Sequence, residues 1–244
     1  MKQLLFGMLL AAVSISQVTA AQHLMKLREV YVGPTDNAAS QYIMLQMYTG
    51  GQNQVNGHAV QVFDATDTIL GTFTFNQSVA NGASQSYILL ATSAAETQFG
   101  VNADLAMSSV IPLAGGKICF DSFDCVAWGN YSGDAINPDS TGTPFNAGAG
   151  LQAARAIRRD ISAGNASQLE AGDDTGDSAA DFAFADPAPF NNGGTAGEDS
   201  YTPPSGGASA PAGGGGSGGG GGGSLGGLSL LALMLAAAFR RRRL

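Results

Sequence analysis

The chain has 244 residues, of which 44% are hydrophobic and only 12% are charged. So low a charged fraction excludes a disordered polyelectrolyte, and 35 glycines with 9 prolines argue against a mostly helical protein. Between the two ends, which differ from it in composition, six basic residues stand against all nineteen acidic ones, a net charge of −13. Such an acidic body repels the phosphate backbone, so binding to nucleic acid is disfavoured.

The first residues have the pattern of a secretory signal peptide. Lys2 precedes an apolar run over residues 4–15, and the small residues Ala20 and Ala21 follow, where a signal peptidase would cut. The apolar run is too short to span a bilayer stably. We therefore expect residues 1–20 to be removed, and the mature chain to begin at Ala21 or the residue after it.

Short strand-like segments dominate residues 21–192. Their apolar residues recur with a period of two, and each segment is bounded by Gly, Asn, Asp or Pro. The expected strands are Leu24–Val32, Gln41–Tyr48, His58–Phe63, Ile69–Phe75, Ser86–Ala91, Lys117–Phe120, Cys125–Trp128 and Ala153–Arg159. About eight short strands with almost no helix predict an all-β domain, with a β-sandwich as the leading architecture.

Local signals predict two turns and one helix within this domain. Both residues of an Asn-Gly pair tolerate positive φ, so tight turns or hairpins are expected at Asn56-Gly57 and Asn81-Gly82. A helix is expected at Ala94–Phe99. Ser93 and Glu96 match a capping box at its start, and Gly100 can take the left-handed conformation that ends it.

The only two cysteines, Cys119 and Cys125, are expected to form a disulfide, because an exported chain with an even count oxidises them. The bond would join the strands Lys117–Phe120 and Cys125–Trp128 at the mouth of a hairpin. Redox catalysis favours the spacing C-x-x-C, and metal binding favours additional His or Cys nearby; neither is present. The predicted role is therefore structural, to fix the register of the hairpin.

Four segments, taken in order, resemble bacterial lamin-tail domains, which are immunoglobulin-like sandwiches found in exported proteins. The opening resembles the family's "EV…P…EYIEL" pattern, and the later segments resemble its "PAGG" turn with the following strands and its "ADF…P.P.N" ending. They are Arg28–Pro34 with Gln41–Gln46, Leu113–Phe120, Asp124–Asn130, and Asp181-Phe182 with Pro187, Pro189 and Asn191. The resemblance implies an immunoglobulin-like β-sandwich of about eight strands over residues 21–192.

The C-terminal part differs sharply from the sandwich. Fourteen glycines lie between Gly206 and Gly227, so residues 193–223 are expected to form a flexible linker. Sixteen uncharged residues follow from Ser224 to Phe239, and a helix of that length is about 24 Å long, a little short for a membrane core. The basic residues after it would stay cytoplasmic and orient the body outward; they are Arg240, Arg241, Arg242 and Arg243.

Residues 224–244, together with Gly222-Gly223 before Ser224, resemble the GlyGly-CTERM sorting signals of Gram-negative bacteria. Those signals are processed by rhombosortase, an intramembrane protease of the rhomboid family. The resemblance implies that the chain is tethered transiently, cut near Gly222-Gly223-Ser224, and delivered to the cell surface or medium, with type II secretion as the expected route. The alternative is a permanent single-span anchor.

We find no pattern typical of an active site or a cofactor site, and expect no catalytic residue and no cofactor. The sequence has two histidines, His23 and His58, and contains no H-E-x-x-H, G-x-S-x-G, P-loop or G-x-G-x-x-G. A Ser-His-Asp triad would have to use His58, which the expected strands place at a turn exit without a strained serine elbow. Asp121 and Asp124 are interpreted as exposed turn carboxylates.

Two further charged clusters have alternative readings. Asp173, Asp174, Asp177 and Asp181 are interpreted as a solvated turn, with a weak Ca²⁺ site as the minority hypothesis, and no metal ligand is predicted. The body's only basic cluster is Arg155, Arg158 and Arg159. Its charges would protect an edge strand from pairing or form a small positive patch.

Together these patterns predict an exported, non-enzymatic binding or adhesion module at the cell surface or in the medium. Two alternatives stay open: an accessory protein of an extracellular nuclease or phosphoesterase system, and a structural envelope protein assembled through sheet edges.

Overall fold

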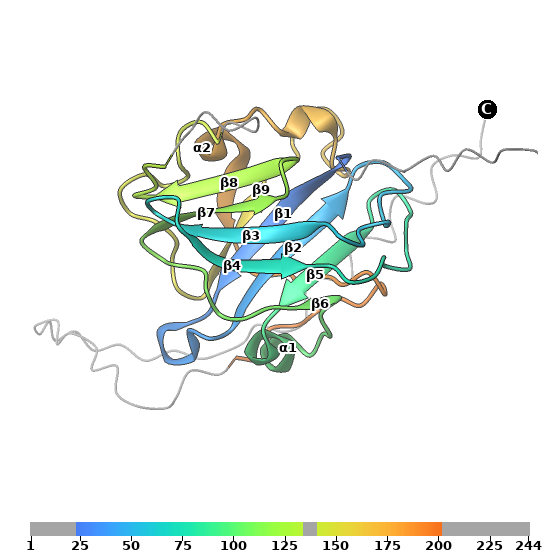
Figure 1. The fold of residues 1–244 in the computed structure, drawn as a ribbon, viewed down its shortest axis with the longest axis horizontal. Helices are drawn as coiled ribbons and strands as arrows, with labels where there is room; N and C mark the ends of the chain where they lie inside the picture. The colour runs from blue at the N-terminus through green and yellow to red at the C-terminus, as the bar shows by residue number, and fades with distance from the viewer. Residues whose placement is uncertain (1–22, 134–140, 202–244) are drawn as a thin grey trace, which may run out of the picture. The chain divides into compact units, whose positions relative to one another are not determined.

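Two β-sheets packed face to face form the body of the protein in the computed structural model, which describes residues 23–133 and 141–201 (Figure 1). Sheet A has the order β10-β9-β1-β2-β5-β6, and sheet B has the order β4-β3-β7-β8. Neighbouring strands are antiparallel except β5 and β6, which are parallel. The expected signal peptide at 1–20 and the expected tail at 224–244 lie outside the described residues.

All eight expected strands are present in this sandwich. Sheet A consists of β1 (Met25–Val32), β2 (Gln41–Met47), β5 (Tyr87–Ala91), β6 (Leu105–Ala106), β9 (Arg155–Arg159) and β10 (Phe182–Ala185). Sheet B consists of β3 (Ala59–Asp64), β4 (Ile69–Thr74), β7 (Gly115–Phe120) and β8 (Asp124–Gly129). The prediction of an all-β sandwich is confirmed, and the two strands it did not include, β6 and β10, are the shortest at the two edges of sheet A.

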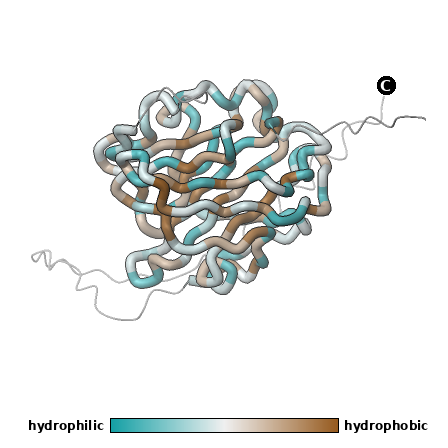
Figure 2. The backbone as a smooth tube through the Cα atoms, viewed as in Figure 1, coloured by the Kyte–Doolittle hydropathy of each residue, from teal (hydrophilic) through white to brown (hydrophobic). Residues whose placement is uncertain are grey.

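The main hydrophobic core fills the space between the two sheets, where apolar side chains from alternate strand positions meet. Figure 2 shows hydrophobic residues concentrated on the strands and hydrophilic ones on the connections. Trp128 on β8 is the largest fully buried side chain, and its indole N–H donates to the carbonyl oxygen of Pro112 at 2.9 Å. Val30 on β1 and Ile43 on β2 contribute from the opposite sheet.

A second apolar cluster covers the outer face of sheet A. Tyr31 and Tyr42 stack with ring centroids 5.1 Å apart, and Phe99 of helix α1 (Ser93–Phe99) meets both rings edge-on. Residues 186–201 complete the cover, and Ser200 donates its backbone N–H to the carbonyl oxygen of Gln98 at 3.0 Å. Residues 193–201, which we expected in the linker, therefore make contacts with the sandwich.

Helix α1 begins one residue earlier than the capping-box pattern predicts. The N-cap is Thr92, whose Oγ1 accepts the backbone N–H of Ala95 at 3.2 Å, so Ser93 is not the cap. Glu96 accepts the backbone N–H of Ala103 at 2.7 Å instead of reaching back to the helix start. The helix ends at Gly100 with φ 61°, as predicted.

Both Asn-Gly pairs lie in turns, but neither forms a hairpin, because each connects strands of different sheets. The first pair forms a tight turn in which the backbone N–H of His58 donates to the carbonyl oxygen of Val55 at 2.9 Å, with Gly57 at φ 86°. In the second, the side-chain oxygen of Asn81 accepts the backbone N–H of Ala83 at 3.0 Å.

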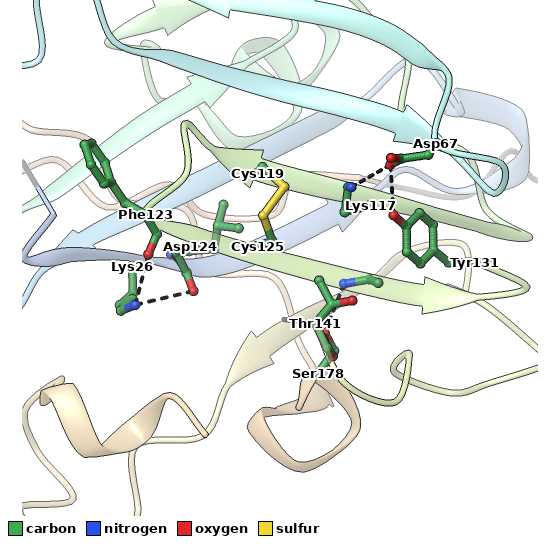
Figure 3. The surroundings of a disulfide bond; sticks show 12 residues. Lys26, Asp67, Lys117, Cys119, Phe123, Asp124, Cys125, Tyr131, Thr141 and Ser178 are labelled. Atoms are coloured by element: carbon green, nitrogen blue, oxygen red, sulfur yellow. Dashed lines mark hydrogen bonds and ion pairs between the residues drawn. A yellow bond between two sulfur atoms is a disulfide. The ribbon is translucent and has the colours of Figure 1, made fainter. Parts of the chain in front are cut away.

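The predicted disulfide between Cys119 and Cys125 is confirmed (Figure 3). The two residues are directly paired in the β7–β8 hairpin, with Cα atoms 4.1 Å apart. Because both strands belong to sheet B, the bond fixes the register of one hairpin and does not connect the two sheets.

Removing this disulfide is expected to cost little stability. The bond closes a loop with a sequence separation of only 6 residues, so the chain-entropy gain is about 2 kcal/mol. The double variant Cys119→Ser with Cys125→Ser should keep the sandwich and lose about 4–8 °C in Tm. Thermal melts followed by circular dichroism measure this, and complete loss of the folded signal would contradict it.

Candidate functional site

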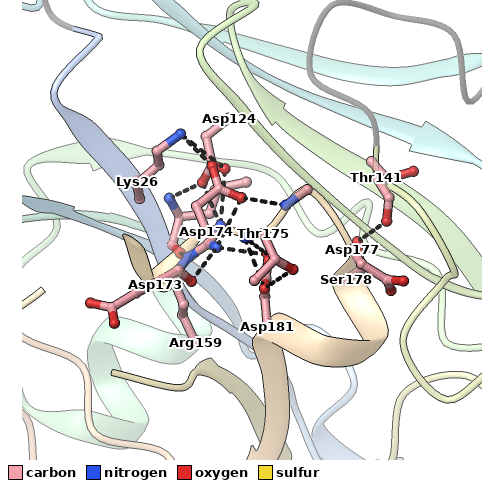
Figure 4. A network of polar contacts seen from close by, with 12 residues as sticks. Lys26, Asp124, Thr141, Arg159, Asp173, Asp174, Thr175, Asp177, Ser178 and Asp181 are labelled. Atoms are coloured by element: carbon pink, nitrogen blue, oxygen red, sulfur yellow. Dashed lines mark hydrogen bonds and ion pairs between the residues drawn. The ribbon is translucent and has the colours of Figure 1, made fainter. Parts of the chain in front are cut away.

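Arg159 is the centre of a buried ion network between β9, β8 and the segment before β10 (Figure 4). The residue is only 1% exposed, and β9 lies between β1 and β10 inside sheet A. Both sequence interpretations of this arginine, edge-strand protection and a positive surface patch, are therefore wrong. A guanidinium group can be buried here because carboxylates from distant parts of the chain surround it.

The guanidinium group of Arg159 connects the two sheets. Its Nη2 lies 2.9 Å from both carboxylate oxygens of Asp124 on β8, and its Nη1 lies 3.3 Å from Oδ2 of Asp181. Its Nε donates to the carbonyl oxygen of Leu27 on β1 at 3.0 Å, while the Leu27 N–H donates to Asp124 at 2.6 Å. The pairing of β1 with β9 covers only Glu29–Val32. The side chains of Arg159 and Asp124 therefore provide the hydrogen bonds to the backbone of Leu27, which lies beyond the last paired residue of β1.

Asp124 is therefore a buried partner of Arg159 and not an exposed turn carboxylate, as the sequence suggested. Burial raises its pKa to about 6, although the charges of Arg159 and Lys26 oppose this effect. A raised pKa of Asp124 is consistent with the charge balance of the network. Its two cations, Lys26 and Arg159, are shared among three carboxylates, those of Asp124, Asp174 and Asp181.

The acidic run is also not a solvated turn. Asp174 lies 2.5 Å from the Lys26 ammonium and 3.4 Å from Nη1 of Arg159, and Asp173 and Asp181 are buried. Asp177 accepts the backbone N–H of Ala179 at the start of helix α2 (Ser178–Asp181). The mutual repulsion on which the Ca²⁺ hypothesis depends is thus relieved by Arg159 and Lys26. No group of acidic, His or Cys side chains within 23–133 and 141–201 is arranged to hold a metal ion.

The other two arginines of the basic cluster are also paired. Nε of Arg158 lies 2.5 Å from Oε2 of the fully buried Glu29, whose other oxygen accepts the hydroxyl of Tyr42 and the backbone N–H of Ala188. Arg155 lies 3.0 Å from Asp186 in an exposed ion pair. Because each arginine has a carboxylate partner, the cluster presents no free positive patch.

His58 pairs with Asp121 beside two aromatic rings. Its Nδ1 lies 2.5 Å from Oδ2 of Asp121, which also accepts the backbone N–H of Ala59 at 2.9 Å through Oδ1. The imidazole packs near Phe120 and Phe123. Asp121 is half-buried, and among the described residues it is the only side chain bonded to the imidazole. The pair therefore fixes the hairpin turn against β3, without a hydroxyl nucleophile bonded to it.

A cavity of about 370 Å³ lies where the connection from β4 to β5 passes from sheet B to sheet A. Three separate parts of the chain form its walls: the start of that connection, the region of β6, and the segment after β10. The lining residues are Phe75, Asn76, Gln77, Ser78, Val79, Ala80, Asp104, Leu105, Asn192 and Gly193. We take this cavity as the candidate binding site and refer to it below as the seam pocket.

Asp104 is held in place within the seam pocket. Its Oδ2 accepts the backbone N–H groups of Leu89 and Asn192, each at 2.8 Å. Its Oδ1 has no hydrogen-bond partner among the residues that the structure describes. Burial raises the pKa of Asp104, although the two N–H donors act in the opposite direction. One carboxylate oxygen is thus anchored, and the other is free to accept hydrogen bonds.

Asn192, which lies next to Asp104, fixes another part of the pocket wall. The residue is 4% exposed, and its Nδ2 donates to the carbonyl oxygens of Asn81 and Tyr87, both at 2.9 Å. Its Oδ1 accepts the backbone N–H of Asn81 at 2.7 Å. These three hydrogen bonds hold the β4–β5 connection against sheet A, so the pocket is largely preformed.

The rim of the seam pocket carries polar groups available to a ligand. Asn76 and Gln77 are exposed, and within the described parts of the chain their side-chain amides have no hydrogen-bond partner. Ser78 donates to Gln54 at 3.2 Å and keeps its capacity to accept. The sequence did not predict this pocket, because no motif connects Asp104 with Asn76, about 30 positions before it, or with Asn192, about 90 positions after it. The only local signal was a single carboxylate in an uncharged stretch of the chain.

Arg159→Met should destabilise the protein far more than the matched substitution Arg155→Met. Loss of the buried guanidinium leaves Asp124 and Asp181 without their main partner, at a cost of about 3–5 kcal/mol. The Arg155–Asp186 pair is exposed to solvent, and breaking it should cost less than about 1 kcal/mol. Urea unfolding of both variants gives the comparison. Equal losses for the two variants would show that the network does not support the sandwich.

Comparison with protein-family models, curated proteins and solved structures finds no match for this chain. Within residues 23–133 and 141–201, no helix combines the length and hydropathy needed to cross a membrane.

Proposed function

We propose that the protein is an exported, non-enzymatic binding module that uses the seam pocket to hold a ligand at the cell surface or in the medium. The single observation that carries the proposal is the anchored Asp104 in a preformed cavity, with one carboxylate oxygen left to accept hydrogen bonds. Concave, preformed sites with a few fixed polar groups are typical of small-molecule binding. Within the described residues, the Ser78 hydroxyl in the lining donates to Gln54 and is not paired with a His or carboxylate base, which favours binding over catalysis.

The proposal includes the immunoglobulin-like lamin-tail class and both sorting signals. Support for the class comes from the two-sheet sandwich and from the family-like segments, which contribute β1, β2, β7, β8 and the region around β10. Support for export comes from the leader at residues 1–20, the Gly222-Gly223-Ser224 tail pattern and the disulfide. Signal peptidase and a rhombosortase-like protease would process the chain before delivery, with type II secretion as the proposed route.

A second candidate function is assembly through a sheet edge. Strand β4 is an edge of sheet B, carries no charge, and exposes Ile69 at 53% and Leu70 at 42%. Uncharged, apolar edge strands are suited to pairing with another chain. This observation favours the structural envelope protein over the accessory protein of a nuclease. An accessory protein of that kind would work close to nucleic acid, and a body with a net charge of −13 repels the phosphate backbone.

Native material is expected to lack both ends of the sequence. Intact-mass analysis of protein isolated from cells and medium should give a chain that starts near Ala21 and ends before Leu225. Recovery of a full-length C-terminus that still carries Arg240–Arg243 would contradict removal of the tail and would favour the permanent anchor.

The binding role is tested by blocking the seam pocket. Ala80 lines the pocket, whereas Ala83 is exposed in the same connection and does not line it. The immobilised protein should retain a component of an envelope extract. The variant Ala80→Phe should retain at least about 90% less of that component, whereas the variant Ala83→Phe should retain as much as the wild type does. Retention unaffected by Ala80→Phe but lost in Leu70→Lys would instead support assembly through β4. No retained component would contradict the binding role.

A further inference from the structure

The charge around the seam pocket restricts the chemistry of its ligand. Among the described residues that line the pocket, Asp104 is the only ionisable one, and none of them is Lys, Arg or His. An anionic ligand would be placed next to this carboxylate and within a body of net charge −13. Phosphate esters, carboxylates and nucleic acids are therefore unsuitable ligands, because nothing in the lining would neutralise their charge.

The polar groups of the lining suit hydroxyl groups. The amides of Asn76 and Gln77 each provide donors and an acceptor side by side, and the Oδ1 of Asp104 is a strong acceptor. A hydroxyl group both donates and accepts, so neighbouring hydroxyls of one ligand can satisfy a carboxylate oxygen and an adjacent amide together. A simple cation would use the carboxylate and the amide oxygens and leave the N–H donors of the two amides unused.

The remaining walls are apolar. Val79, Leu105 and Phe75 line the pocket, and Phe75 is only 3% exposed. Sugar rings combine a rim of hydroxyl groups with C–H faces that pack on such surfaces. The volume of about 370 Å³ is near the lower end of the range of about 300–1,000 Å³ for small-molecule sites, which fits about one or two sugar rings.

We propose that the seam pocket binds a neutral carbohydrate, with Asp104 accepting hydrogen bonds from ring hydroxyls and Asn76 and Gln77 forming the rim. This inference rests on the proposed binding function and specifies its ligand class. The protein would thereby recognise a neutral glycan through walls that three separate parts of the chain provide.

The test is a titration of the mature protein with glucose, galactose, mannose, N-acetylglucosamine and cellobiose, followed by amide chemical shifts in NMR spectra. At least one sugar should cause saturable shifts at Gln77, Asn192 and Gly193. The double variant Asn76→Ala with Gln77→Ala should bind that sugar about tenfold more weakly, because two hydrogen bonds are lost. The matched variant Asn102→Ala, at an exposed position outside the pocket, should bind as the wild type does.

The variant Asp104→Asn tests whether the charged carboxylate contributes to sugar binding. The asparagine can still accept the backbone N–H groups of Leu89 and Asn192, but the charged acceptor is lost, so sugar binding should weaken. If this variant fails to fold, the Asn76 and Gln77 variant still decides the question, since those side chains have no partner among the described residues.

Failure of this inference can be told apart from failure of the binding function. Envelope capture that is lost in Ala80→Phe, with no sugar shifting the pocket residues, would leave the binding function intact and overturn the carbohydrate assignment. Saturable shifts at Asn192 and Gly193 with spermidine but with no sugar would also overturn it, in favour of a cationic ligand. Sugar binding that is unchanged in both pocket variants would place the sugar elsewhere and contradict the proposal.

Discussion

The fold depends on the burial of one guanidinium group. Arg159 lies at the junction of the two sheets, and it can remain there only if carboxylates and carbonyl oxygens replace the water it has lost. Asp124 comes from sheet B, Leu27 from the neighbouring strand β1, and Asp181 from the segment that leads into β10. Satisfying this one side chain therefore fixes how the sheets and the last strand are placed relative to one another.

The same requirement explains which parts of the structure could be predicted from the sequence. Strands and the disulfide follow from local rules, period two and cysteine spacing, and these predictions were confirmed. The predictions that the charged clusters are exposed were wrong. Charged residues are rarely buried, and the local sequence around these residues gives no sign that they are buried. The partners of Arg159 lie 35 positions away at Asp124 and 132 positions away at Leu27, distances over which no motif operates.

The sequence of strand β2 contains a signal of burial that a period-two pattern does not describe. The run Tyr42–Leu45 is continuously apolar, and every residue of β2 is buried, which is the pattern of a strand covered on both faces. Ile43 and Leu45 face the core between the sheets, while Tyr42 and Met44 face α1 and the C-terminal segment. The seam pocket has no such signal, since its walls meet only after three distant segments have been brought together by Asn192 and Asp104.

The C-terminal cover over sheet A has a consequence for the order in which the protein can fold. A polypeptide leaves the ribosome from its N-terminus, so Tyr31, Tyr42 and Phe99 are synthesised long before residues 186–201 exist to cover them. Until that last segment arrives, the outer face of sheet A presents an aromatic surface to solvent. A growing chain is thus at its most prone to aggregation just before synthesis of the domain is complete.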